Sequence, residues 1–278
     1  MVEPIALTVF QGRAGDHNDR AIPGAASIGR ALAKKLGLEP LLIGVPEPAL
    51  NLPWEQELHA AMPALQAMVR RCESIYRMGL KPITASSRCA VSLATLPPVA
   101  KFYPDVSVVW FDSHPDLNTP ETSGTGYLGG LALAGPAGLW DSGLGAGIDL
   151  AKAVLVGERD IDPVEQDLID RGICKLIPPG AGMAGPLKEA LKGRRIYIHI
   201  DCDVLNPGIV PTDYRHEGGL TLADLHAACA VMAECAVVGL EIAEFENTWE
   251  PGGEPVSPTP LLEACEPVIQ TLICPMLP

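Results

Sequence analysis

The sequence predicts an α/β fold, a three-layer α/β/α sandwich around a mostly parallel sheet of about eight strands. Short apolar, β-branched runs alternate with helix-like segments along all 278 residues. The runs are continuously apolar, which is typical of parallel strands that are covered on both faces. This alternation predicts right-handed crossovers. Because no internal repeat or obvious linker interrupts it, we expect one domain spanning residues 1–278.

Eight apolar runs are the expected strands. In chain order they are Ile5–Phe10, Pro40–Val45, Pro82–Ala85, Val106–Asp112, Ala153–Glu158, Cys174–Ile177, Arg195–Asp201 and Val237–Glu244. Six segments between or after them are the expected helices. The first ends at Gly37, which can form a left-handed cap, and the second ends at Gly79. The helices are Gly24–Leu36, Trp54–Met78, Asp162–Arg171, Pro186–Lys192, Leu222–Glu234 and Pro260–Leu272.

The composition limits the classes of partner. The formal net charge is −14, which argues against nucleic-acid phosphates and anionic membranes as partners. The same negative field would steer a cationic small molecule toward the protein. An acidic surface that only aids solubility is the simpler interpretation, and both remain open.

The N-terminal residues MVEPIALTVFQGR lack the basic region and long apolar run that mark a secretory signal. No stretch approaches the roughly 18 apolar residues of a membrane span. We therefore expect a cytoplasmic protein with reduced thiols. None of the eight cysteines forms a C-x-x-C pair, so most of them, Cys274 included, are expected to be small apolar core residues.

Acidic residues stand at the ends of three predicted strands. Asp112, Asp201 and Glu244 each close an apolar run, and ligands of parallel sheets bind beyond the carboxyl ends of strands. Burying a carboxylate there costs free energy unless a cation pairs with it. Three such positions therefore indicate a metal ion or a cationic ligand.

The first of two clusters has the pattern D-x-H-x-D, formed by Asp112, His114 and Asp116. Alternate residues at the end of a strand can point to one side, and two carboxylates with an imidazole suit a divalent ion such as Mn²⁺. A polar loop with helix-capping aspartates would give the same short pattern. The cluster alone is therefore a moderate signal.

The second cluster lies in IYIHIDCDVLNP, residues 196–207, where Asp201 and Asp203 leave a buried strand on one face. Their mutual repulsion would raise a pKa unless a cation lies between them. His199 is on the same face one step earlier. A hydrogen-bonded core histidine is its simpler interpretation, and support of the metals from beneath is the alternative.

Together the two clusters resemble the paired motifs of the arginase/agmatinase (ureohydrolase) family, here DSHPD followed by IDCDVLNP. The resemblance extends to VLVGERDIDPVE at 154–165, GGLTLADL at 218–225 and GLEIAEFE at 239–246. These segments span roughly residues 80 to 246 in the family's order. The resemblance therefore implies the arginase fold and the hydrolysis of a C–N bond in a linear amidine.

Residue roles follow from the resemblance alone. It implies two Mn²⁺ ions that hold a bridging hydroxide, which attacks a guanidine to release urea, or hydroxyurea, and an amine such as ornithine. The implied ligands are Asp112 and Asp201 for both ions, His114 and Asp203 for one, and Asp116 for the other. Glu244 matches the carboxylate that grips the guanidinium, so Asp116 and Glu244 are the expected catalytic acids. The amino-acid end of the substrate is expected at Asn118, Thr125, Asp162 and Glu165.

The sequence departs from the family at the first metal motif, where Arg88 and Cys89 replace an aspartate and a histidine. A thiolate favours Zn²⁺ or Fe²⁺ over Mn²⁺. One interpretation is therefore that Cys89 is a weak ligand or a near neighbour of a depleted metal site. Alternatively, it is an inert small residue in a site that holds one metal ion. Both interpretations remain open.

A second departure is Gly129, where the family commonly has a histidine that carries a proton to the leaving amine. General acid catalysis contributes typically 10²–10⁴-fold, so its loss favours a modified guanidine over arginine. The string TGYLGG with Cys89 resembles the branch that includes N-omega-hydroxy-arginine hydrolase. Tyr127 either fills the space of the missing histidine or simply packs in its loop. The short loop 207–218, with Arg215 and His216, also departs from the family.

The leading hypothesis is thus a metal-dependent hydrolase acting on arginine or N-omega-hydroxy-L-arginine. The alternative is a catalytically impaired family member that binds a ligand or partner, which the changes at Cys89 and Gly129 motivate. A nucleotide-binding protein is disfavoured, because G-x-G-x-x-G and G-x-x-x-x-G-K-[ST] are absent. Family members often assemble as trimers or hexamers, so a homo-oligomer is compatible with the resemblance, but no segment indicates an assembly surface.

Overall fold

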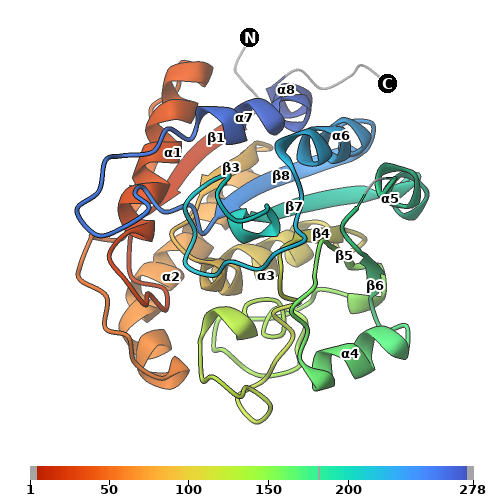
Figure 1. Cartoon of the computed structure of the whole chain (residues 1–278), viewed down its shortest axis with the longest axis horizontal. Coiled ribbons are helices and arrows are strands. Elements are labelled where there is room, and N and C mark those ends of the chain that lie inside the picture. The colour runs from red at the N-terminus through yellow and green to blue at the C-terminus, as the bar shows by residue number, and fades with distance from the viewer. Residues whose placement is uncertain (1–4, 181, 274–278) are drawn as a thin grey trace.

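A single eight-stranded sheet forms the centre of the computed structural model, which describes residues 5–180 and 182–273 (Figure 1). Every strand pair is parallel, and the strand order is β2-β1-β3-β8-β7-β4-β5-β6. The strands are β1 (Ile5–Phe10), β2 (Leu41–Ile43), β3 (Lys81–Ala85), β4 (Ser107–Phe111), β5 (Val154–Val156), β6 (Lys175–Ile177), β7 (Arg195–Asp201) and β8 (Ala236–Ala243). The predicted α/β sandwich is confirmed, and the sheet is wholly parallel.

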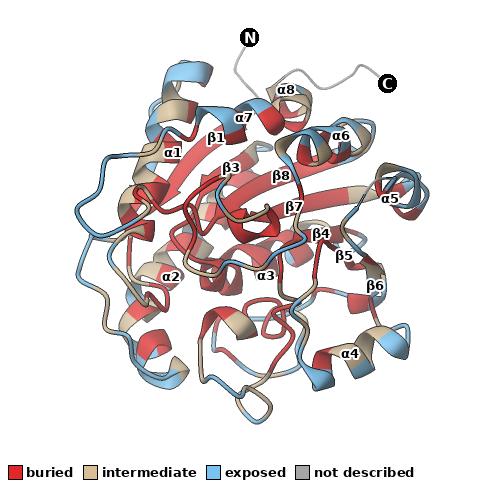
Figure 2. Ribbon diagram, in the orientation of Figure 1, coloured by how far each residue is buried: buried red, intermediate tan, exposed pale blue. Residues whose placement is uncertain are grey.

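Helices cover both faces of the sheet. They are α1 (Ala21–Leu36), α2 (Trp54–Arg77), α3 (Ser92–Phe102), α4 (Pro163–Asp170), α5 (Ala184–Leu191), α6 (Leu222–Met232), α7 (Thr259–Ala264) and α8 (Glu266–Ile273). Apolar residues of α1, α5, α6, α7 and α8 form one core against the sheet, whereas α2 and α3 build the core of the opposite face. The inner strands between these layers are almost entirely buried, whereas the edge strands β2 and β6 are partly exposed (Figure 2).

Alternate side chains of a strand enter different cores, which explains the continuous apolar runs. In β4, Val109 and Phe111 pack with the α1 layer, whereas Val108 and Trp110 pack with the α2 and α3 layer. All four are buried. A strand with two dry faces must be apolar at every position, and this requirement produces the sequence pattern.

Helix α3 is not among the helices predicted from the sequence. Pro97 and Pro98 lie inside it, and proline removes a hydrogen bond and disfavours the helix interior. Burial overrides this preference, since every residue from Ser92 to Ala100 is buried. A short segment with the 3₁₀ turn Cys89–Val91 joins β3 to α3, so the buried helix anchors one end of the chain that carries Ser86 to Cys89.

The predicted helix Pro260–Leu272 is wrong as one element, because α7 and α8 are separate helices divided at Cys265. Pro267 explains the break. In a continuous helix its ring would clash with the carbonyl of Glu263, whereas in the first turn of α8 its missing N–H has no consequence. The remaining predicted helices differ from the structure only at their ends. Gly37 does cap α1 in the left-handed conformation, with φ of 67°.

Strand order determines where a ligand can bind. The chain passes from β3 to β4, which are not neighbours, and later inserts β7 and β8 between them. The carboxyl ends of β3, β8, β7 and β4 therefore lie side by side, and the connections that follow them diverge. In open parallel sheets, such a switch point opens a crevice for a ligand.

Seven cysteines in the described part of the chain are free thiols, and all but the half-buried Cys235 are buried. Cys274 lies outside the described residues. No helix within residues 5–180 and 182–273 combines the length and the apolarity that crossing a membrane requires.

Candidate active site

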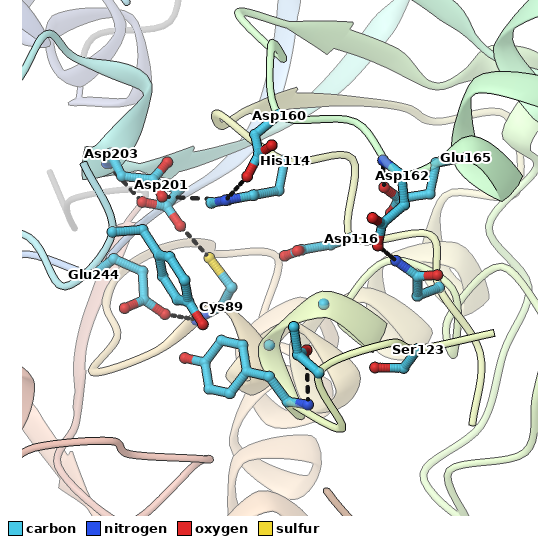
Figure 3. Close-up of a pocket in the computed structure, with 16 residues that line it drawn as sticks. Cys89, His114, Asp116, Ser123, Asp160, Asp162, Glu165, Asp201, Asp203 and Glu244 are labelled. Atoms are coloured by element: carbon cyan, nitrogen blue, oxygen red, sulfur yellow. Dashed lines mark hydrogen bonds and ion pairs between the residues drawn. The ribbon is translucent and has the colours of Figure 1, made fainter. Parts of the chain in front are cut away.

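A cavity with an empty volume of about 700 Å³ opens at the carboxyl ends of the central strands (Figure 3). Its walls contain all the residues that the sequence analysis assigned to metals or substrate except Asp112. Asp112 lies directly beneath the wall, in contact with His114. The lining residues are Cys89, His114, Asp116, Asn118, Ser123, Thr125, Tyr127, Gly129, Gly130, Asp160, Asp162, Glu165, Asp201, Asp203, Tyr214 and Glu244.

The end of β4 places an imidazole between two carboxylates. The Nδ1 atom of His114 is 3.2 Å from Asp112 Oδ1 and 3.3 Å from Asp203 Oδ2. Asp203 follows β7, the strand next to β4, and its Oδ1 accepts a hydrogen bond from the Ser113 backbone at 2.9 Å. This bond joins the two strand ends, so the donor atoms converge although ninety residues separate them.

Cys89 reaches the same acids from β3, at the start of a short 3₁₀ turn, Cys89–Val91. Its Sγ is 2.9 Å from Asp201 Oδ2 and 3.9 Å from Asp112 Oδ2. The thiol therefore lies among the predicted metal ligands. Burial and the neighbouring carboxylates raise the pKa of Cys89 well above its ordinary value. Without a cation, the thiol stays protonated.

Asp116 lines the cavity from the loop that follows β4, and its backbone is left-handed, with φ of 53°. Its carbonyl accepts hydrogen bonds from Leu133 and Ala134, at 3.1 and 3.0 Å. A non-glycine residue costs free energy in this conformation, so the surrounding contacts must hold it there. The side chain of Asp116 lines the cavity from this conformation.

Burial makes this group of acids costly to ionise. It raises the pKa of Asp112 to about 7, and Asp203 adds to the shift. Burial and neighbouring acids also raise the pKa of Asp116 and Asp201 well above the usual range. Burial opposes ionisation of Asp203 too, but the hydrogen bond with His114 lowers its pKa to about 2. Among these acids Asp203 therefore ionises most readily, whereas burial favours the neutral form of the other three.

The donor set fits divalent cations. Within the described residues, four groups of side chains offer ligand atoms within 4.8 Å of one another. They are Asp112 with His114 and Asp203, Cys89 with Asp201 and Glu244, Cys89 with Asp112 and His199, and His114 with Asp160 and His216. Carboxylates with an imidazole suit Mn²⁺, and the added thiol suits Zn²⁺ or Fe²⁺.

His199 fits both of its sequence interpretations at once. It is fully buried and stacks on Trp110, with ring centroids 3.7 Å apart. Its Nε2 is 3.2 Å from Cys89 Sγ, and its Nδ1 is 3.1 Å from Ser92 Oγ. Ser92 in turn donates to Glu241, which is buried in the core beneath the cavity. His199 thus belongs to the core and also supports the cluster from below.

The opposite wall carries the residues expected at the amino-acid end of a substrate. Asn118 Nδ2 donates to Asp162 Oδ2 at 2.8 Å. Glu165 accepts the backbone N–H groups of Leu117 and Asp162, at 2.9 and 3.0 Å, and so ties the loop after β4 to the start of α4. Burial raises the pKa of Glu165 to about 7. Thr125 lines the same wall.

Glu244, at the far end of the cavity, already has a guanidinium partner within the protein. Arg88 Nη1 donates to Glu244 Oε2 at 2.7 Å, and the Cys89 backbone donates to Oε1 at 2.8 Å. Burial raises the pKa of Glu244 to about 7, against the opposing effect of Arg88. From the sequence, Arg88 is recognised only as a departure from the family's first metal motif. Its pairing with Glu244 could not be foreseen, because 156 residues separate the two.

Tyr127 fills the position that a side chain at Gly129 would need. A Cβ atom added to Gly129 would lie 2.3 Å from Tyr127 Cε1, well inside van der Waals contact. The Tyr127 ring is 4.2 Å from the His17 ring. Its buried hydroxyl has no hydrogen-bond partner within the described residues. Of the two interpretations of Tyr127, space filling is confirmed.

The cavity also contains residues that the sequence analysis did not select. Asp160 Oδ2 is 3.6 Å from His114 Nε2 and 3.3 Å from His216 Nε2, so it supports the outer face of the His114 ring. The Tyr214 ring is 5.2 Å from that of His114. Asp160 lies in the R-D-x-D segment and could have been chosen from it. Tyr214 had no signal beyond its place in the unusual loop.

We predict that Gly129→Ala destabilises the protein by about 1–3 kcal/mol, because it overpacks the space that Tyr127 occupies. Gly130→Ala is the matched control, since its added Cβ would meet no atom within 4 Å. Urea unfolding of both variants measures the difference. In a Tyr127→Ala background the cost of Gly129→Ala should vanish. An equal cost in both backgrounds would contradict the packing argument.

Comparison with known proteins agrees with this geometry. The Arginase family profile matches residues 48–256. An N(omega)-hydroxy-L-arginine amidinohydrolase from Streptomyces lavendulae is 42% identical over 241 residues, which cover 87% of this chain and 88% of that protein. The solved arginase from Bacillus caldovelox has the same fold, with a TM-score of 0.81, 22% identity and complete coverage of both chains. Proclavaminate amidino hydrolase from Streptomyces clavuligerus also shares the fold, with a TM-score of 0.71 and 18% identity over 97% of this chain and 92% of that one. The extent of the profile match and the identity to the Streptomyces lavendulae protein establish that this chain belongs to the arginase family.

Proposed function

We propose that this protein is a metal-dependent amidinohydrolase that cleaves a C–N bond of N-omega-hydroxy-L-arginine, releasing hydroxyurea and ornithine. One observation carries the proposal. The ends of β3, β4, β7 and β8 bring five acids, an imidazole and a thiol to one cavity, whose opposite wall is polar. The printed name of the relative with 42% identity favours the hydroxylated substrate over L-arginine, which would yield urea.

Two divalent cations would be held by residues that the strand ends bring together. His114 and Asp203 would bind one, Cys89 and Asp116 the other, and Asp112 and Asp201 would contact both. When bound, such ions lower the pKa of water enough to supply a nucleophile at neutral pH. Mn²⁺ is the ion we propose, with one site weakened by Cys89.

The chain's own residues would orient the substrate between the two walls. Asn118, Thr125, Asp162 and Glu165 offer donors and acceptors for an α-amino and an α-carboxylate group. Glu244 would receive the amidine end, because it faces the cavity beside the metal ligands Cys89 and Asp201. Holding both ends places the amidine carbon over the acids, and such positioning lowers the activation barrier.

Tyr127 would close the cavity where other family members commonly have a histidine. Its ring excludes water from the amidine end, and burial raises the pKa of its hydroxyl, so the hydroxyl remains a neutral donor. Gly129 itself has no group that can carry a proton. The site should therefore depend more on the reactivity of its substrate than an arginase does.

A non-catalytic binding protein is the second candidate. Two observations favour it, the thiol of Cys89 among the metal ligands and the absence of a side chain at Gly129. Release of ornithine from N-omega-hydroxy-L-arginine by the purified Mn²⁺-loaded protein separates the candidates. Metal uptake without cleavage of that compound or of L-arginine would refute the enzyme proposal.

We predict that Asp201→Ala loses bound metal and lowers turnover at least 100-fold, because it removes a carboxylate that would help to hold both ions. Metal content by elemental analysis and ornithine release by chromatography measure the two effects. Asp167→Ala is the control, since Asp167 is exposed on α4 and its one ion pair within the described residues is with Arg171 at the end of that helix. Retained turnover in Asp201→Ala would contradict the assignment.

We predict that Cys89→His raises the Mn²⁺ affinity at least tenfold, because an imidazole binds Mn²⁺ better than a thiol does. Titration calorimetry with Mn²⁺ measures the change. Cys235→His, at a half-buried thiol away from the cavity, should leave the affinity unchanged. Equal affinity in the wild type and Cys89→His would show that residue 89 does not contact the ions.

A further inference from the structure

The side chain of Arg88 is a fully buried cation placed against one wall of the cavity. Its exposed fraction is zero, and its Nη1 lies 2.7 Å from Glu244 Oε2. Its Nε donates to Asp16 Oδ1 at 3.1 Å, and Asp16 is also buried. Removing a guanidinium from water costs free energy unless its partners are well placed, and charge-assisted hydrogen bonds to Asp16 and Glu244 offset that cost here.

Arg88 is the centre of a network of acids, only one of which faces the cavity. Asp213 lies 3.6 Å from Nη1, and Glu246 lies 3.7 Å from Nη2. Each of these more distant acids has its own cationic or polar partner. Arg20 is 2.9 Å from Glu246, and His17 is 3.1 Å from Asp213. Glu244 alone lines the cavity, so it is the acid through which Arg88 acts on a ligand.

The protein already uses both oxygens of Glu244. Oε2 accepts from Arg88, and Oε1 accepts from the backbone of Cys89. A carboxylate has about four lone-pair sites, so roughly two remain for a ligand. Glu244 can therefore still accept hydrogen bonds from a substrate, but Arg88, which also pairs with Asp16, already offsets part of its negative charge.

A cationic substrate and a neutral one meet this arrangement differently. A protonated guanidinium on Glu244 would place a second positive charge close to Arg88, in a site of low dielectric where like charges repel strongly. An uncharged amidine can donate the same N–H bonds without that repulsion. An electronegative oxygen on the amidine lowers its basicity, and hydroxyguanidines and guanidinooxy compounds are amidines of this kind.

We propose that Arg88 is a specificity-determining residue. It favours the binding of weakly basic, oxygen-substituted amidines over that of the guanidinium of arginine. This inference rests on the proposed hydrolase function. It adds the physical basis of selection, the pairing of Glu244 with a guanidinium of the chain itself.

The test compares steady-state kinetics of the Mn²⁺-loaded wild type with L-arginine, N-omega-hydroxy-L-arginine and L-canavanine, whose guanidine carries an oxygen. We expect kcat/KM to be at least tenfold higher for both oxygen-substituted compounds than for L-arginine. Part of the difference should appear in KM, since charge repulsion acts on binding whereas intrinsic reactivity acts on kcat. Equal kcat/KM for all three would overturn the inference and leave the hydrolase function intact.

Two variants isolate the charge of Arg88. Arg88→Met removes the charge. It should lower the ratio of kcat/KM for the oxygen-substituted compounds to kcat/KM for L-arginine at least fivefold, chiefly through a change in KM. Arg88→Lys retains the charge and should preserve the preference. A loss of turnover with an unchanged preference in Arg88→Met would assign Arg88 a structural role only and overturn the inference.

The outcomes remain distinct if the variants fail to fold. Arg88 is buried, so circular dichroism of both variants precedes the kinetics. Without folded variants, the wild-type KM values decide, since a lower KM for L-arginine than for L-canavanine would overturn the inference. Absence of turnover with all three compounds would instead refute the proposed hydrolase function.

Discussion

The structure depends on one constraint, the burial of several carboxylates at adjoining ends of parallel strands. Asp112, Asp201 and Asp203 leave β4 and β7 with almost no exposure to solvent. Within the protein, His114 offsets part of their charge, and burial raises the pKa of the acids that it does not fully neutralise. Protonation or a bound cation relieves the cost of burying acids in such numbers, so the fold itself prepares this edge of the sheet for positive charge.

The departures from the family pattern surround one acid. Cys89 donates its backbone N–H to Glu244, and Arg88 donates its guanidinium to the same carboxylate. Tyr127 occupies the space beside Gly129 and lies close enough to Glu244 for that acid to raise the pKa of its hydroxyl. Arg88 and Cys89 are distant from Tyr127 and Gly129 in the sequence, but the four residues are contiguous in space. The departures are therefore concentrated on one side of the cavity.

Sequence patterns predicted the parts of the fold that follow from local requirements. Strands buried on both faces must be continuously apolar, and acids at their ends point to the ligand, so the sheet and the motifs around Asp112 and Asp201 could be read directly. Helix α3 could not, because the tertiary burial of its two prolines overrides their local preference. The partner of Arg88 was equally hidden, since it joins the ends of β3 and β8 across 156 residues. No pattern in either segment records which guanidinium Glu244 binds.

The two walls of the cavity differ in how far they depart from the family, and this difference bears on selectivity. The wall with Asn118, Asp162 and Glu165 carries the residues that the family resemblance assigns to the amino-acid end. The wall with Cys89 and Tyr127, with Arg88 buried behind Glu244, carries the departures, and in the proposed reaction it would face the amidine group. With such a cavity, the substrate would still carry the α-amino and α-carboxylate groups of an amino acid. It would differ from arginine only in the basicity and substitution of its amidine. Glu244 stays in the wall, and Arg88 offsets part of its charge. The site would therefore bind the amidine through neutral hydrogen bonds in place of ionic attraction, with the same donors and acceptors.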